Sequence, residues 1–360
     1  MPDTTLSELN SLLGNPRHTA PVWWPVRLAR RIKLPPIIAG ILAFVVLLTL
    51  YGLSGLIPWT PEALAAKGTE GVGEALFYAF SLAFLLTLTN VILPAAQRDL
   101  DELRPYLALD DEQILACRRT LIRHPRPDLL LASVIGGTFG LVHTWALGDS
   151  PLILINDFSS ILAVTVLSRI AIWVLMFQLG FLLVANSHFF QRLGASYLHI
   201  DLYNPHKLYA FGRTALRPTL FLLGLQAAYP LLVLGQTALQ PLSFIGLGAS
   251  LALVLWLFFE PMHGVHRQLK ATRARALADI DRRLASLWQM QGNTSVPEQS
   301  EGVDEATRLL DLRQHLHGAP TWPLGLAGAR RILIYVIIPP LGWGITVLTD
   351  LWLQRLASGL

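Results

Sequence analysis

Charged residues are scarce in this sequence: Asp, Glu, Lys and Arg make up only 14% of its 360 residues. A soluble domain usually carries about 25% charged residues, so this chain has too little polar surface to cover a globule in water. The hydrophobic fraction of 53% and the mean hydropathy of +0.48 fit a lipid environment instead. A single cysteine excludes a disulfide framework and a zinc site built from several cysteines. The composition therefore predicts an integral membrane protein.

Catalytic motifs are also missing. The sequence contains no glycine-rich phosphate loop with its lysine, no Gly-x-Ser-x-Gly elbow, no complete Gly-x-Gly-x-x-Gly and no His-Glu-x-x-His. The first thirty residues lack the apolar core of a cleavable signal peptide, so none is expected. These absences favour a non-enzymatic function, and the sequence leaves any cofactor unidentified.

Long apolar runs are abundant. A helix needs roughly 17–25 residues to cross a hydrocarbon core about 30 Å thick. Six runs reach this length, and a seventh is interrupted by Pro339 and Pro340, which kink or break a helix. The predicted fold is all-α: a polytopic helical membrane bundle of six transmembrane helices plus a Pro-kinked C-terminal seventh segment, with a small helical cytoplasmic layer. The predicted spans are 37–58, 75–94, 129–147, 158–186, 218–238 and 243–259, and the seventh segment is 332–349.

The basic residues predict the orientation. Of the 28 Lys and Arg residues, all except Lys67, Arg169 and Arg355 lie in four stretches that the spans place on one side. Because positively charged loops stay in the cytoplasm, the protein is expected in the cell inner membrane as a multi-pass protein with a cytoplasmic N-terminus. Its expected partners are membrane lipids, above all the anionic inner leaflet. Topology already accounts for the basic residues, so they do not indicate nucleic-acid binding.

These spans divide the chain into four parts. A cytoplasmic or interfacial amphipathic N-terminus precedes a six-helix transmembrane domain, which is followed by a cytoplasmic helical segment and a C-terminal membrane segment. The transmembrane domain includes two cytoplasmic loops, of which the second is rich in aromatic residues and is expected to lie along the inner leaflet in short amphipathic pieces. The parts are 1–36, 37–260 with loops 95–128 and 187–217, 261–331 and 332–360.

Three helices are predicted in the cytoplasmic layer. Asp110 and Gln113 form a capping-box pattern at the start of the first. An apolar stripe predicts a second helix that continues from the sixth span to about Met290, and a third lies near 303–317. The spacing in the second is typical of a coiled coil over fewer than three heptads. It packs either on the protein's own helices or on another subunit.

Arg169 is the most informative single residue, because it lies about eleven residues into a long apolar run. An arginine near the bilayer centre costs at least about 2.5–3.5 kcal/mol to insert, so it requires acceptors from another span or from water. It lines an anion or headgroup path, or it is a structural clamp. The other strongly polar residues inside the predicted spans complete the set of pore or ligand candidates: Asn90, His143, Gln178 and Gln226.

Histidines supply two further candidate sites. Glu260, His263 and His266 recur every three residues, a spacing at which a carboxylate and an imidazole on one helix can meet one metal ion. Pro261 disturbs that helix, and the alternative is a set of interfacial histidines with a capping carboxylate. The candidate interfacial ligands in the aromatic loop are His188, His199 and His206.

Three functions are consistent with these features. No Asp or Glu lies deep within a predicted span, which argues against proton- or sodium-coupled carriers. Arg169 and the closely spaced Gly136 and Gly140 suggest a homo-oligomeric ion channel or pore. The first alternative is a non-catalytic membrane sensor, scaffold or accessory subunit that couples the bundle to the cytoplasmic helices. The second is a metal-dependent membrane enzyme. The chain is expected to be a homo-oligomer or a subunit of a membrane complex.

Overall fold

The computed structural model describes residues 27, 34–57, 70–157, 161–199, 208–233, 241–291, 298–318 and 322. Within these ranges the chain contains helices and no strands, so the all-α prediction is confirmed there. The helices are α3 (Pro36–Leu53), α5 (Glu70–Leu103), η2 (Arg104–Tyr106), α6 (Asp111–Thr120), α7 (Arg126–Ala146), α8 (Ile153–Asn156), α9 (Ile161–Ser196), α10 (Tyr209–Gln226), α11 (Pro230–Val233), α12 (Pro241–Gln291) and α13 (Glu298–Gly318).

Four of these helices are long and apolar enough to cross a membrane: Pro36–Leu53, Gly71–Tyr106, Arg126–Ala146 and Ile161–Ser196. They indicate a multi-pass integral membrane protein. The predicted count of six spans plus a seventh segment is not confirmed. The seventh segment, 332–349, lies outside the described residues, and so does the amphipathic N-terminus, 1–36, apart from the exposed Arg27 and residues 34–36.

The largest difference from the predicted spans concerns 218–238. No continuous helix covers the described part of this run, because α10 ends at Gln226 and a turn separates it from the four-residue α11. The helix begins earlier than predicted, at Tyr209, and includes the basic residues Arg213 and Arg217. The run 243–259 is helical but forms only the first part of α12.

Two predicted spans belong to helices that continue past the predicted span ends. α5 continues through Pro94 to Leu103, and α9 continues to Ser196, ten residues past its predicted end. At 1.5 Å per residue these helices are about 51 and 54 Å long, which exceeds the hydrocarbon thickness of about 30 Å. Each therefore extends beyond one side of the membrane.

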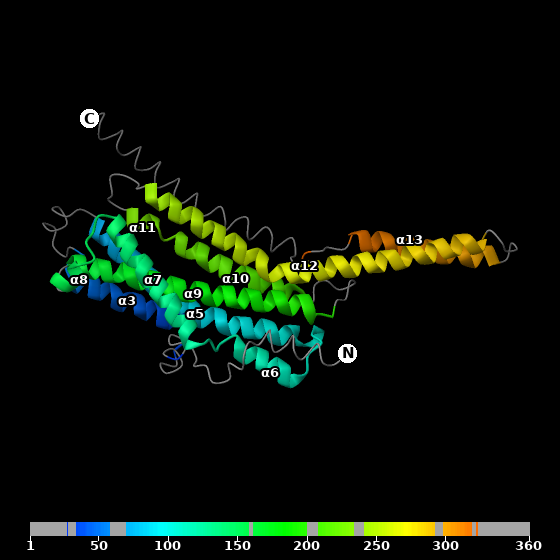
Figure 1. Ribbon diagram of the computed structural model, residues 1–360, viewed down its shortest axis with the longest axis horizontal. Coiled ribbons are helices and arrows are strands. Elements are labelled where there is room, and N and C mark those ends of the chain that lie inside the picture. The colour runs from blue at the N-terminus through cyan, green and yellow to red at the C-terminus, as the bar shows by residue number, and fades with distance from the viewer. Residues whose placement is uncertain are drawn as a thin grey trace, which may run out of the picture.

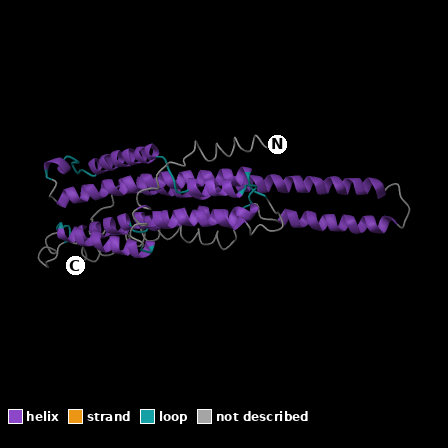
Figure 2. Cartoon of the chain, turned by 90° about the horizontal axis from the view of Figure 1, so that it is seen from below, coloured by secondary structure: helices purple, strands orange, loops and turns teal. Residues whose placement is uncertain are grey.

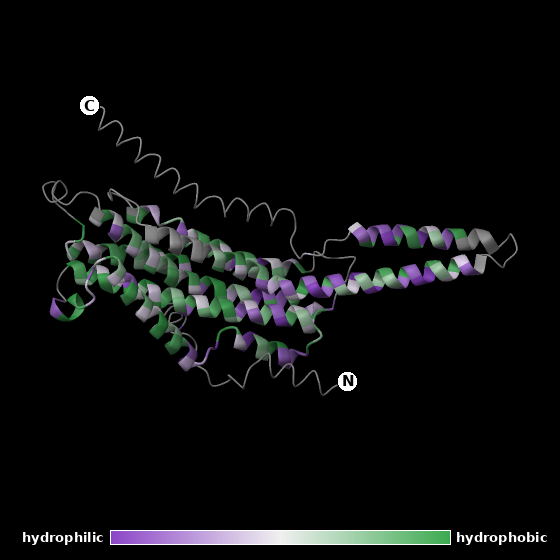
Figure 3. Ribbon diagram, turned by 45° about the horizontal axis from the view of Figure 1, so that its top comes forward, coloured by the Kyte–Doolittle hydropathy of each residue, from purple (hydrophilic) through white to green (hydrophobic). Residues whose placement is uncertain are grey.

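The bundle packs α3 on α5, α7 on α9, and α12 on both α9 and α10. Its central core includes Tyr78 and Leu88 of α5, Leu182 of α9 and Leu257 of α12. α3 and α7 expose apolar side chains on their outer faces, such as Ile37 and Leu130, as expected for helices that face lipid. Hydrophobic residues dominate this part of the molecule in Figure 3.

A second core lies at one end of the bundle, where α6, the ends of α5, α9 and α10, and the middle of α12 meet. It brings together the predicted loops 95–128 and 187–217 with the start of segment 261–331. Four of the described aromatic residues of loop 187–217 are buried here instead of lying along a leaflet, whereas Tyr209 is half-buried. The four are Phe189, Phe190, Tyr197 and Phe211. The predicted capping box is confirmed, because Asp110 and Gln113 exchange side-chain and backbone hydrogen bonds at the start of α6.

A helical hairpin projects from this end of the bundle (Figures 1 and 2). We call residues 271–291 of α12 together with α13 the arm, the end of the bundle from which it projects the arm end, and the opposite end the far end. The arm has its own small core of Ile280, Leu284, Leu309 and Leu316. Two predictions for the arm are confirmed. The helix that continues from the sixth predicted span ends near Met290, as α12 does, and the helix predicted at 303–317 is α13, which begins five residues earlier.

Candidate functional site

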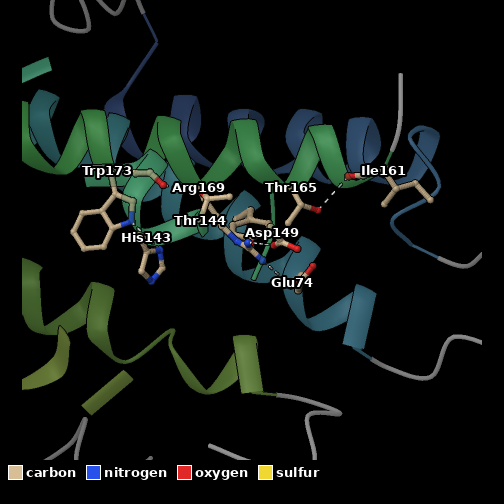
Figure 4. A network of polar contacts seen from close by, with 10 residues as sticks. Glu74, His143, Thr144, Asp149, Ile161, Thr165, Arg169 and Trp173 are labelled. Atoms are coloured by element: carbon tan, nitrogen blue, oxygen red, sulfur yellow. Dashed lines mark hydrogen bonds and ion pairs between the residues drawn. The ribbon is translucent and has the colours of Figure 1, made fainter. Parts of the chain in front are cut away.

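Arg169 lies near the far end of the bundle among groups that neutralise and hydrogen-bond it (Figure 4). Its Nε–H donates to the Tyr78 hydroxyl at 2.9 Å, and its guanidinium forms an ion pair with Asp149. Its Nη2 lies 3.6 Å from Oε1 of Glu74. The Arg169 side chain is only 13% exposed. We call Glu74, Tyr78, Asp149 and Arg169 the Arg169 cluster.

The acidic partners come from the ends of neighbouring helices. Glu74 lies in the second turn of α5, and Asp149 follows α7 in a turn where Gly148 has a φ of 88°, a conformation that glycine adopts readily. Arg169 is eight residues from the start of α9, or about 12 Å along its axis. The long side chain therefore meets its carboxylates towards the helix ends. Sequence reasoning looked for an acid deep in a span, and so it missed both.

Hydroxyl groups extend this polar region to α3. Tyr51 Oη and Ser168 Oγ are 2.8 Å apart, and both residues are buried. Ser168 directly precedes Arg169, so adjacent residues of α9 bind α3 on one side and α5 on the other. The arrangement fits the structural clamp that the sequence left open.

The other polar residues of the predicted spans form separate local contacts. Trp173 Nε1 donates to His143 Nδ1 at 3.3 Å, and Gln178 Nε2 donates to Ser133 Oγ at 2.6 Å, so both contacts join α7 to α9. Asn90 donates to the carbonyl of Leu86 within its own helix. Gln226 ends α10. These contacts do not link the four residues and Arg169 into one polar network.

A second charged cluster, which sequence reasoning missed, lies at the arm end. The Asp99 side chain is only 1% exposed, and it accepts from Arg213 Nε at 3.3 Å and pairs with Arg217. Arg213 also pairs with Glu102. The signal was present in the sequence, because the two acids are three residues apart on α5 and the two arginines four apart on α10. Asp99 lies in the predicted loop 95–128, whereas the structure places it on α5.

A cavity of about 20 Å³ lies beside Asp99 and Arg217 of this second charged cluster, where α5, α9, α10 and α12 meet. Its lining includes Asn186, Arg217 and the helix-internal prolines Pro218 and Pro261. Asn186 Nδ2 is buried without a hydrogen-bond partner in the structure. A cavity of this size accommodates about one water molecule. It is too small for an organic substrate.

The histidine candidates are divided among different contacts. His188 Nδ1 lies 3.0 Å from Glu260 Oε1, and the His188 ring also contacts Trp256 edge to face. His266 stacks on Trp322 with ring centroids 4.2 Å apart.

His263 is exposed, and the backbone of His199 donates to Tyr106. His206 lies outside the described residues. In the part of the chain that the structure describes, no three His, Cys, Asp or Glu side chains come close enough together to hold a metal ion.

The arm is fixed to the bundle by close packing of α12 on α9. A Cβ at Gly264 would overlap the backbone carbonyl of Gln191, and one at Gly194 would come within 2.5 Å of Val265 Cγ2. Gln268 Nε2 donates to the carbonyl of Ala195. We call these contacts the root of the arm. Small residues let the two backbones approach here, as in other tightly packed membrane helices.

The glycines of α7 also serve contacts within the chain. A Cβ at Gly136 would lie 2.8 Å from the carbonyl oxygen of Trp173, and one at Gly140 would lie 2.9 Å from Cα of Ile170. α9 therefore covers the face of α7 that carries these two glycines.

Comparison with models of protein families, with curated proteins and with solved structures finds no match. The function of the chain is therefore inferred from its own geometry.

Proposed function

We propose that this chain is a non-conducting scaffold of the cell inner membrane, which holds a helical arm in the cytoplasm for a partner to bind. The observation that carries the proposal is the continuity of α12, whose 51 residues form one helix from the bundle into the arm. Such a helix is about 76 Å long, more than twice the hydrocarbon thickness of about 30 Å. More than half of α12 therefore lies outside the membrane.

The root of the arm supports this proposal. Gly194 and Gly264 bring α9 and α12 into backbone contact, and Val265 and Leu269 are buried in the second core. Because packed interiors resist deformation, a helix held in this way moves with the bundle. The arm is then a fixed extension of the membrane domain.

The contacts inside the bundle favour a non-conducting protein. The sequence suggested a channel because of Arg169 and the glycines of α7. Arg169 has carboxylate partners in the same chain, and Gly136 and Gly140 pack on α9. These contacts account for both features without a pore.

The distribution of arginines supports a cytoplasmic arm. The ends of α5 and α10 that carry Arg98 and Arg213 lie at the arm end together with α6 and its Arg118. Positively charged segments are retained in the cytoplasm. The side of the membrane on which the arm lies is tested by thiol labelling.

For the labelling experiment, Thr307→Cys places a thiol on the exposed surface of α13. Ile155→Cys provides the matched control, because Ile155 is exposed on α8 at the far end. A membrane-impermeant maleimide should label Thr307→Cys only in inside-out vesicles and Ile155→Cys only in intact cells. The reverse pattern, or labelling of both variants from one side, would contradict the proposed topology.

Ion flux tests the other half of the proposal. Purified protein in liposomes should pass no ions at any voltage or membrane tension, while a pore-forming peptide added to the same liposomes should. Reproducible flux that Arg169→Met alters would instead establish the homo-oligomeric channel. Stoichiometric iron or zinc in the purified protein, lost in a Glu260→Gln variant, would establish the metal-dependent enzyme.

A further inference from the structure

The arm carries an exposed apolar flank besides its core. Trp288, Val303 and Leu310 are 65%, 54% and 49% exposed. Trp288 directly follows the core-facing Leu287, Leu310 directly follows the buried Leu309, and Val303 lies seven residues before Leu310. In an antiparallel helix pair, the residues that directly follow the second apolar position of each heptad lie on the same side of the pair in both helices. We call these three residues the arm flank.

The two helices of the arm have opposite charge. Residues 271–291 of α12 include four basic and two acidic residues, a formal charge of +2, whereas α13 has two basic and five acidic residues, a formal charge of −3. One ion pair already joins the helices within the chain, between Arg313 and Asp281 at 2.9 Å. Most other charged groups of the arm are exposed to solvent. They are available to attract a helix pair with the same charge pattern.

We infer that the arm flank binds the arm flank of a second copy of this chain, so that two arms form a four-helix bundle. Both copies lie in one membrane with the same orientation, so the two-fold axis that relates them runs along the arms. This symmetry places each basic α12 next to the acidic α13 of the second copy and leaves like-charged helices on the diagonal. Apolar and electrostatic complementarity thus select the same partner.

This inference rests on the proposed function, since it identifies the partner of the scaffold's arm. The apolar stripe of α12 with coiled-coil spacing packs on α13 of the same chain, the first of the two alternatives expected from the sequence, so the contact between copies uses the flank beside that stripe. α13 covers only one side of that helix within the chain, because residues on the flank of both helices remain exposed.

Cross-linking between differently tagged chains tests the inference directly. One full-length chain carries Trp288→Cys, the other carries Val303→Cys, and both carry Cys117→Ala to remove the native thiol. In the proposed bundle, position 288 of one chain lies beside position 303 of the other. A short bismaleimide added to membranes from cells expressing both chains should therefore give a product that carries both tags.

The matched control uses Ser286→Cys and Glu305→Cys, which are exposed and lie about 160° around their helices from Trp288 and Val303, on the opposite flank of the arm. This pair should give no product with both tags. Equal cross-linking of the two pairs would mean random collision and would overturn the inference.

The mass of the purified protein provides a second readout. The wild-type particle should have the mass of two chains, and Val303→Lys should halve that mass, while Ser286→Lys on the opposite flank should leave it unchanged. Circular dichroism shows whether each variant keeps its helices. A wild-type monomer, or a dimer that Val303→Lys does not affect, would refute the arm pairing. Ion flux or labelling from the wrong side would refute the scaffold instead, whatever the cross-linking result.

Discussion

Neutralising Arg169 should destabilise the bundle, and the loss should depend on Asp149. Arg169→Met keeps the length of the side chain but leaves Asp149 and Glu74 near each other without a cation. Removing one partner from a buried ion pair typically costs about 3–5 kcal/mol. The three charged side chains are between 13% and 26% exposed, so we expect the lower end, about 3 kcal/mol.

Asp149→Asn should cost less, because Arg169 keeps Glu74 and the hydrogen bond to Tyr78. A hydrogen bond to a charged group contributes about 1.5–3 kcal/mol, and we expect about 1.5 kcal/mol here. In the double variant, Glu74 is the one carboxylate of the cluster left without a cation. The loss of unfolding free energy in the double variant should therefore be smaller than the sum of the two single losses by about 1–2 kcal/mol.

The assay is reversible unfolding of the purified protein in mixed micelles with an increasing fraction of denaturing detergent, followed by circular dichroism. Asp311→Asn removes an exposed charge from α13 and serves as the control, with an expected change within about 0.5 kcal/mol. Costs of Arg169→Met and Asp149→Asn that add within about 0.5 kcal/mol would show that the two residues do not interact. That result would refute the structural role assigned to the Arg169 cluster.

Three further predictions concern other parts of the fold. Burial raises the pKa of Cys117 to about 11 from its ordinary value of 9.0, so alkylation of the folded protein at pH 7.5 should be at least about tenfold slower than in denaturant. The same shift keeps the folded thiol protonated, so its contribution to stability is present below pH 9 and is lost as the pH rises towards 11, which unfolding measured across that range checks. Gly136→Ala should cost about 1–3 kcal/mol because its Cβ meets α9 backbone, whereas Gly137→Ala, whose nearest neighbour is a side-chain atom at 3.8 Å, should unfold like the wild type in the same assay. Asp110→Ala should cost about 1 kcal/mol by removing the α6 cap, and Asp110→Asn should restore most of it when their unfolding midpoints are compared.

Local signals in the sequence predicted much of the fold. The Asp110 capping box, the end of α12 near Met290 and the separate helix α13 each depend on residues close together in the chain. Apolar length likewise identified the four helices that are suited to cross a membrane. What failed was the assignment of helix ends, because α5 and α9 continue past their apolar runs where the second core buries residues such as Leu100 and Phe190.

The partners of polar residues could not be predicted, because they come from distant positions. Arg169 lies 20 residues from Asp149, 91 from Tyr78 and 95 from Glu74 in the sequence. No local pattern relates such positions. A count of acids deep within spans missed them, because a long arginine side chain reaches carboxylates at the ends of neighbouring helices.

The distance between two labels on α12 tests the central claim most directly, because the scaffold depends on one unbroken helix from the root to the tip of the arm. His263 and Gln289 are exposed and 26 residues apart, so spin labels at these positions should be separated by about 39 Å. The distance is measured by pulsed electron paramagnetic resonance in lipid nanodiscs, on a chain that also carries Cys117→Ala. We predict one narrow distribution of distances near that value. A broad distribution, or a mean much shorter than about 39 Å, would contradict it.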